Sequence, residues 1–127
     1  MIGYDDPVVE AEANEVDVLF FEVGDIVYGT DASVVLRIDR SHPEDLAVAE
    51  LGGLKRGNRA LVFDTPEGEG HLKVDAIRGV RPVPIMDLRR LPPAVAAASY
   101  AVGVFLDEER PVMLIDLVET LNSQGRH

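Results

Sequence analysis

Three pairs of short apolar runs, each interrupted by a tight polar turn, dominate this sequence. The first pair, VDVLFFEV and IVYG, flanks Gly24 and Asp25. The second pair flanks the polar segment at residues 65–70, and the third flanks the segment DEER at residues 107–110. Runs of this length, rich in valine, isoleucine and aromatic residues and separated by glycine or charged residues, are typical of β-hairpins. The sequence therefore predicts three hairpins and a protein built mainly of strands.

The segment after the first hairpin carries mixed signals. Residues 33–38 (SVVLRI) predict a further strand. Ser41 is followed three residues later by Glu44, with Pro43 between them, a pattern typical of a helix N-terminus. We therefore expect a short helix from there to about Leu51, where two glycines follow.

Prolines limit the segment between the second and third hairpins. Residues 71–80 predict the single return strand of the second hairpin. Prolines at positions 82, 84, 92 and 93 exclude a long helix or a central strand over residues 81–93, because proline lacks an amide donor. We expect an extended connection there, with one helical turn near residues 86–90.

The two ends of the chain differ from its middle. Residues 1–15 contain five acidic residues, no basic residue and no apolar period, so we expect a flexible acidic arm. A short helix is expected over residues 116–122, after the third hairpin. The globular domain is then expected to span residues 16–122, and residues 123–127 to be a frayed C-terminus.

Each predicted hairpin begins near a phenylalanine and ends at an aspartate that precedes an apolar residue. An internal repeat and a mere similarity of strand length both explain this pattern, and the sequence leaves the two open. We expect the three aspartates to accept hydrogen bonds from backbone amides at turns or helix caps rather than to perform catalysis. The three pairs are Phe21 and Asp31, Phe63 and Asp75, and Phe105 and Asp116.

Charge and composition limit the partners that the chain can have. Twelve Lys and Arg against 23 Asp and Glu give a net charge of −11, which repels phosphate. We therefore expect neither nucleic acid nor a membrane as a direct partner. The longest apolar run, residues 94–106, is too short to span a bilayer, and the first residues do not resemble a signal peptide. We expect a cytoplasmic protein.

The sequence offers few groups for catalysis. It contains no cysteine, and its three histidines, at positions 42, 71 and 127, lack the spacing of metal ligands. The glycine pairs lack the Lys-Ser/Thr of a phosphate-binding loop. We expect no enzyme, no metal and no cofactor, and a protein that acts by contact with other proteins.

Several segments, in their order along the chain, resemble the CheW-like coupling proteins of bacterial chemosensory systems. Residues 18–31 (VLFFEVGDIVYGTD) resemble the opening hairpin of the family. Residues 73–80 and the proline-rich segment at residues 83–93 are similar to its Val-Asp-x-Val strand and the stretch that follows. Residues 100–103 and 111–117 resemble its last hairpin and terminal Asp-Leu element. Together these segments cover most of the expected domain.

The resemblance implies an all-β fold with two small, intertwined five-stranded β-barrel subdomains and short helical turns. It also implies a non-catalytic adaptor without cofactors, since family members link the cytoplasmic tips of chemoreceptors to the histidine kinase CheA. The implied partners are the signalling domain of a methyl-accepting chemoreceptor and either a CheA-type kinase or another CheW-like protein.

The chain departs from the family pattern in two places. Residues 41–58 are shorter than the block that the family carries there, so we expect the first barrel to lack a strand. An alternative alignment matches residues 77–89 loosely with that block. Arg37 stands where the family often has an acidic residue, and a like-charge contact can cost several kcal/mol. We predict that coupling to the kinase is weakened or lost, while contact with receptors or the array remains.

The contact residues are expected on the exposed side of residues 34–38 and along residues 80–88. Alternate side chains of a strand face opposite ways, so one of Val35 and Ile38 is expected in the core. Two other functions stay open: a barrel that senses a small ligand, and a conventional coupler that binds both receptor and kinase. The predicted protein-binding residues are Val35, Arg37, Ile38, Val80, Val83 and Met86.

Overall fold

The computed structural model describes residues 14–48, 51–90 and 100–124, and it contains all three predicted hairpins. The strands of each hairpin pair in antiparallel fashion. The hairpins are β1 (Glu15–Val23) with β2 (Ile26–Asp31), β4 (Arg59–Thr65) with β5 (Gly68–Val74), and β8 (Ala101–Asp107) with β9 (Arg110–Ile115). The other elements are η1 (Ala32–Val34), β3 (Val35–Arg40), β6 (Ala76–Pro84), η3 (Ile85–Asp87), β7 (Leu88–Arg90) and α2 (Leu117–Gln124).

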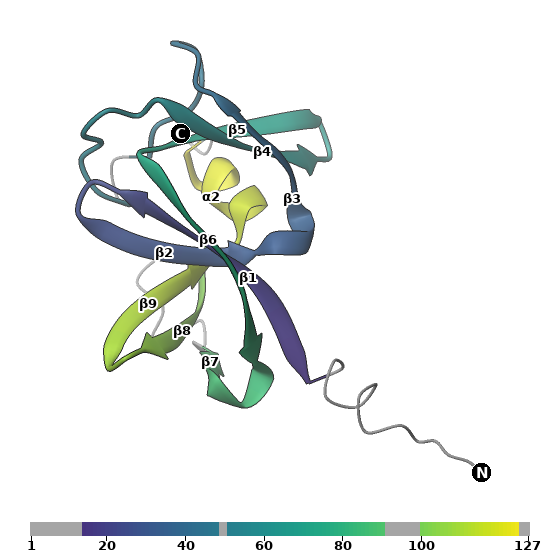
Figure 1. Cartoon of the computed structure of the whole chain (residues 1–127). Helices are drawn as coiled ribbons and strands as arrows, with labels where there is room; N and C mark the ends of the chain where they lie inside the picture. Colours follow the sequence, from purple (N-terminus) through teal and green to yellow (C-terminus); the bar gives the residue numbers. More distant parts are fainter. Residues whose placement is uncertain (1–13, 49–50, 91–99, 125–127) are drawn as a thin grey trace.

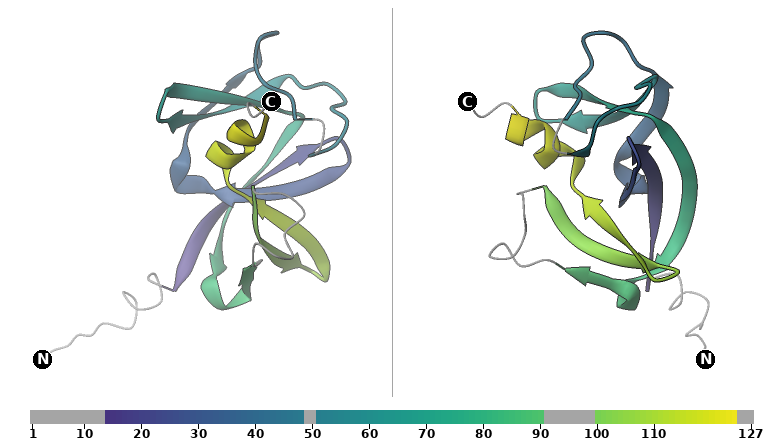
Figure 2. Two further views of the ribbon diagram at one scale, coloured as in Figure 1. Left: turned by 180° about the vertical axis from the view of Figure 1, so that it is seen from behind. Right: turned by 90° about the vertical axis from the view of Figure 1, so that its left-hand side faces the viewer.

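The strands form two sheets. The larger has the order β6-β1-β2-β9-β8-β7, and the smaller has the order β3-β4-β5. Figure 1 shows the small sheet and α2 at one end of the molecule, β7, β8 and β9 at the other, and β1, β2 and β6 crossing between them. The strands of the larger sheet curl, as both views in Figure 2 show. The predicted all-β fold of two intertwined barrels is confirmed.

Strand β1 separates two apolar cores, and its residues alternate between them. Phe21 lies in the first core with Phe63 of β4. Phe20 lies in the second core, where its ring centroid is 6.0 Å from that of Phe105 of β8. A strand buried on both faces explains why the sequence of β1 is an almost continuous apolar run rather than an alternating one. We name the parts around these cores the first and the second subdomain.

Helix α2 closes the first subdomain, as predicted for this part of the chain. Asp116 accepts a hydrogen bond from the amide of Glu119 at 3.0 Å and so caps the helix. Leu117 is buried in the first core, and Leu121 packs against it. A Cβ atom at Gly70 of β5 would lie 2.5 Å from Cδ1 of Leu121 and 3.0 Å from side-chain atoms of Phe63 and Thr65, so a larger residue there would force these side chains to shift.

The predicted helix after Ser41 is wrong over the described residues 41–48, which form a turn and an isolated bridge. The turn closes because the amide of Asp45 donates to the carbonyl of His42 at 3.0 Å, and the carboxylate of Asp45 accepts from the amide of His42 at 2.8 Å. Leu46 then pairs with β5 beside Leu72. Pairing with a distant strand thus replaces the local helix that the capping pattern favours.

The predicted single strand over residues 71–80 is two strands, because the chain breaks at Asp75 between β5 and β6. Strand β6 continues through Pro82 and Pro84, further than expected, because it is an edge of the larger sheet, where prolines are tolerated. The helical turn expected near residues 86–90 is confined to η3, because residues 88–90 form strand β7, and α2 ends at Gln124. The predicted acidic arm up to residue 13 and the last three residues of the predicted frayed end lie outside the described residues.

Candidate protein-binding groove

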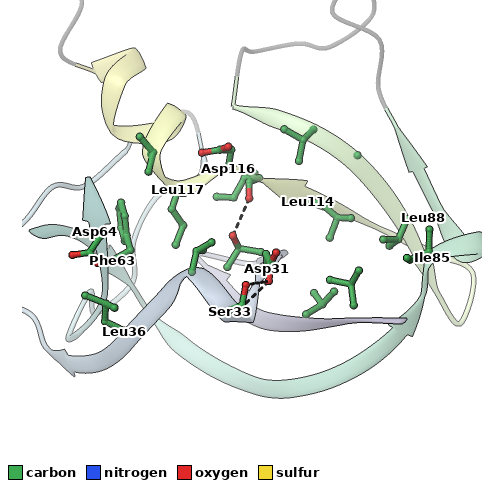
Figure 3. Close-up of a pocket in the computed structure, with 18 of the residues that line it drawn as sticks. Asp31, Ser33, Leu36, Phe63, Asp64, Ile85, Leu88, Leu114, Asp116 and Leu117 are labelled. Carbon is green, nitrogen blue, oxygen red and sulfur yellow. Dashed lines mark hydrogen bonds between the residues drawn. The ribbon is translucent and has the colours of Figure 1, made fainter. Parts of the chain in front are cut away.

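A groove of about 800 Å³ runs between the two subdomains. Its walls come from η1, from all strands except β5 and β6, and from η3 and α2. Figure 3 shows Leu36 and Phe63 on one side of the groove, and Ile85 and Leu88 on the opposite side. The groove therefore joins segments that are far apart in the sequence.

Four half-exposed apolar side chains line this groove. Val34 is 45% exposed, Leu36 48%, Ile85 46% and Val102 46%. They come from four different elements, η1, β3, η3 and β8. Exposed apolar side chains that gather in one hollow mark a binding surface rather than random exposure.

The polar groups of the groove mostly serve the local backbone. Asp31 caps η1 by accepting from the amide of Ser33 at 2.9 Å. The hydroxyl of Thr30 donates to the carbonyl of Ile115 at 2.9 Å, and Arg89 donates to the carbonyl of Met86 at 2.6 Å. In the part of the chain that the structure describes, no group of three histidine or acidic side chains could hold a metal ion. The part of the groove that these groups leave open is mainly apolar.

The predicted contact residues lie in different environments. Val83 is 2% exposed in the second core, so its side chain cannot meet a partner. Val35 is partly buried and packs against the first core, whereas Ile38 is 40% exposed. Val80 and Met86 are 52% and 82% exposed. None of these five side chains lines the groove.

The groove is lined instead by near neighbours of the predicted residues, including Val34, Leu36 and Ile85. The prediction assumed a regular strand over residues 34–38. In the structure η1 ends at Val34, and the register of β3 shifts between Val35 and Arg37. A shift of one residue moves every following side chain to the other face of a strand. Both segments that were predicted to bind a partner border the groove. The side chains that line it, however, are those of Val34, Leu36 and Ile85 and not the predicted ones.

Arg37 is exposed, and its charge is neutralised by neighbours on the same sheet. Its guanidinium donates to both carboxylate oxygens of Glu69, at 2.9 and 3.0 Å, and to Asp39 at 2.8 Å. The hydrogen bond to Glu69, followed by that to Asp39, raises the pKa of Arg37, and the hydrogen bond from Arg37 lowers the pKa of Glu69. A partner at this face meets a paired arginine rather than a free positive charge.

Asp75 ties two distant turns together. Its carboxylate accepts from the amides of Gly24, Lys55, Arg56 and Gly57 at 2.6 to 3.0 Å. Burial alone would raise the pKa of Asp75, but the hydrogen bonds from Lys55, Arg56, Gly57 and Gly24 hold it well below its usual range. The expectation that this aspartate binds backbone amides is confirmed, as it is for Asp31 and Asp116.

Comparisons with known proteins place the fold and the family. No protein family model matches the chain. The chain is 68% identical over 111 residues to the Frizzy aggregation protein FrzB of Myxococcus xanthus, a match that covers 87% of this chain and 99% of that protein. Its structure is similar to that of the scaffolding protein TtCheW of Thermoanaerobacter tengcongensis, with a TM-score of 0.70 and 19% identity, over 88% of this chain and 96% of the other. The described helix is too short and too polar to cross a membrane. The extent of the match to FrzB, together with the shared fold, shows that the chain belongs to the CheW-like family.

Proposed function

We propose that the protein is a non-catalytic, cytoplasmic adaptor of a chemotaxis-type signalling system, and that its groove receives the cytoplasmic tip of a chemoreceptor. The proposal rests on the convergence of Val34, Leu36, Ile85 and Val102 on one groove. Apolar grooves of this kind take up the apolar face of an amphipathic partner helix. Its membership of the CheW-like family supports an adaptor role.

We further propose that coupling to a CheA-type kinase is weakened or lost. The segment between β3 and β4 is short, and its described part forms a turn and one bridge to Leu72. The small sheet has three strands, and β3 is one of its edges. A short connection beside an edge strand supports a reduced surface for the kinase on this side of the first subdomain.

The groove also favours a second candidate, the binding of a small ligand. Its volume of about 800 Å³ lies within the range of small-molecule sites, roughly 300–1,000 Å³, and its walls are mainly apolar. A metabolite bound there would make the protein a sensor module.

Calorimetric titrations of the purified protein against a chemoreceptor signalling domain and against the regulatory region of the cognate kinase test the proposal. We expect binding to the receptor domain and weak or no binding to the kinase region. Leu36→Asp places a charge in the groove and should lower receptor affinity at least about tenfold, the effect of losing a central contact. Leu106→Asp is the matched control, because Leu106 is 61% exposed and lies outside the groove.

Equal receptor affinities of the two variants would exclude the groove as the receptor site. Kinase binding of ordinary strength would instead show a conventional coupler. If neither partner binds and a metabolite raises the melting temperature, the sensor function is the correct one.

A further inference from the structure

The two sides of strand β3 differ in whether their charged side chains form ion pairs. Arg37 and Asp39 bind each other, and Arg37 also binds Glu69 of β5. Ile38 and Arg40 alternate with them along the strand and therefore point to the other side. Ile38 is 40% exposed, and Arg40 is exposed.

Arg40 lies directly opposite Arg59 in the antiparallel pair of β3 and β4. Side chains at such positions have Cβ atoms about 5 Å apart, and like charges there destabilise the sheet. Backbone pairing on both sides of Arg40 and Arg59 fixes the register of β3 against β4. Asp39 is paired with Ala60 before it, and beyond it the amide of Ser41 donates to the carbonyl of Asn58 at 3.1 Å. The backbone thus holds Arg40 and Arg59 at directly opposite positions of the two strands.

Neither Arg40 nor Arg59 forms an ion pair within the described residues. Two other exposed arginines are paired: Arg78 binds Glu22 at 2.6 Å, and Arg81 binds Asp107 at 3.0 Å. Acidic residues outnumber basic ones by 23 to 12, so carboxylates are abundant in this chain. Two adjacent arginines without a counter-charge are therefore a feature that an external anion would stabilise.

We propose that Ile38, Arg40 and Arg59 form a docking patch for an acidic segment of a partner protein. The two guanidinium groups bind carboxylates, and Ile38 contacts an apolar side chain between or beside them. The patch lies next to the groove along β3, since Leu36 lines the groove near the start of the strand and Arg40 ends the strand.

The probe for this patch is a fluorescein-labelled peptide of alternating glutamate and leucine, and a peptide with lysine in place of glutamate is its control. Binding is followed by fluorescence anisotropy and by the chemical shifts of the ¹⁵N-labelled full chain. We expect the acidic peptide to bind and to shift the amide signals of Ile38, Arg40 and Arg59 most strongly. The lysine peptide should leave these signals unchanged.

Variants separate the patch from the general charge of the surface. The double variant Arg40→Glu/Arg59→Glu should lower affinity for the acidic peptide at least about tenfold. The neutral double variant Arg40→Gln/Arg59→Gln should lower it less, and it serves if the glutamate pair disturbs folding. Arg110→Glu is the control, because Arg110 is exposed in the second subdomain and has no ion pair in the described chain.

Undiminished binding by both double variants would overturn the proposal. So would shifts centred on the groove, equal loss in Arg110→Glu, or no binding of the acidic peptide at all. Loss confined to the two double variants supports the patch.

Discussion

Replacing Asp75 with asparagine should destabilise the protein more than any other single isosteric change of a surface carboxylate. Oδ2 of Asp75 accepts from the amide of Gly24 at 2.6 Å, and Oδ1 accepts from the amides of Arg56 and Gly57 at 2.7 Å each. An asparagine has one acceptor oxygen, so its NH₂ group must face an amide donor on one side of this arrangement.

The size of the effect follows from the environment of the four donors. The bonds from Gly24 and Gly57 are partly buried, whereas those from Lys55 and Arg56 are exposed and can be replaced by water. Hydrogen bonds to charged groups contribute about 1.5–3 kcal/mol each. Loss of one partly buried bond and weakening of the other gives about 2–3 kcal/mol. For a chain of this size that lowers the melting temperature by roughly 10 °C.

The pH dependence provides a second test of the same reasoning. Because the pKa of Asp75 in the folded protein is depressed, its contribution is present in full above the pKa of an unfolded aspartate, about 3.9, and is lost progressively as the pH falls from there through the lower pKa of the folded state. The difference in urea unfolding between wild type and Asp75→Asn should therefore be full at pH 7 and should narrow steadily as the pH falls below about 3.9. Asp25→Asn is the control, since the Asp25 side chain is 84% exposed. An Asp75→Asn variant as stable as wild type at pH 7, or a difference as large at pH 2 as at pH 7, would refute the reasoning.

Two further predictions concern packing. Gly70→Val should destabilise the protein by about 2 kcal/mol, because the new side chain meets Leu121, and circular dichroism should report the displaced helix. A variant with unchanged unfolding would show that α2 does not rest on this position. Val83→Ala should cost about 2 kcal/mol as a core truncation, whereas Met86→Ala at an 82% exposed site should stay within about 0.5 kcal/mol. Denaturant titration checks both, and equal effects would place Val83 outside the core.

The hairpins could be predicted from the sequence because their signals are local. Gly24 and Asp25 turn the chain between two apolar runs, and the same logic holds for the other two hairpins. The helix expected after Ser41 failed because its competitor was distant in sequence. Leu46 pairs with Leu72 of β5, and no sequence pattern near residue 46 predicts that pairing.

The sequence predicted which segments border the groove, but not which of their side chains line it. Strand alternation is reliable while the register is regular, and here η1 and the shift between Val35 and Arg37 change the face of each side chain. Val83 illustrates the same limit, since a valine between two prolines suggested an exposed connection. In the structure it pairs with Val16 and lies in the second core.

Two features were proposed to reduce kinase coupling: the positive charge of Arg37 and the short segment between β3 and β4. The structure weakens the first of these reasons. The sequence argument held that Arg37 inverts the charge that a partner meets. In the fold that charge is paired with Glu69 and Asp39, so the shorter segment between β3 and β4 becomes the stronger reason.

The double variant Arg37→Glu/Glu69→Arg separates these reasons, because it reverses the sign at position 37 and keeps an opposite charge across the sheet. We expect its affinity for the regulatory region of the kinase to equal that of wild type. Arg37→Glu alone is the comparison, since it brings three carboxylates together without a counter-charge and should be more sensitive to salt. A gain in kinase affinity of tenfold or more in the double variant would show that the sign at position 37, and not the short segment between β3 and β4, controls coupling.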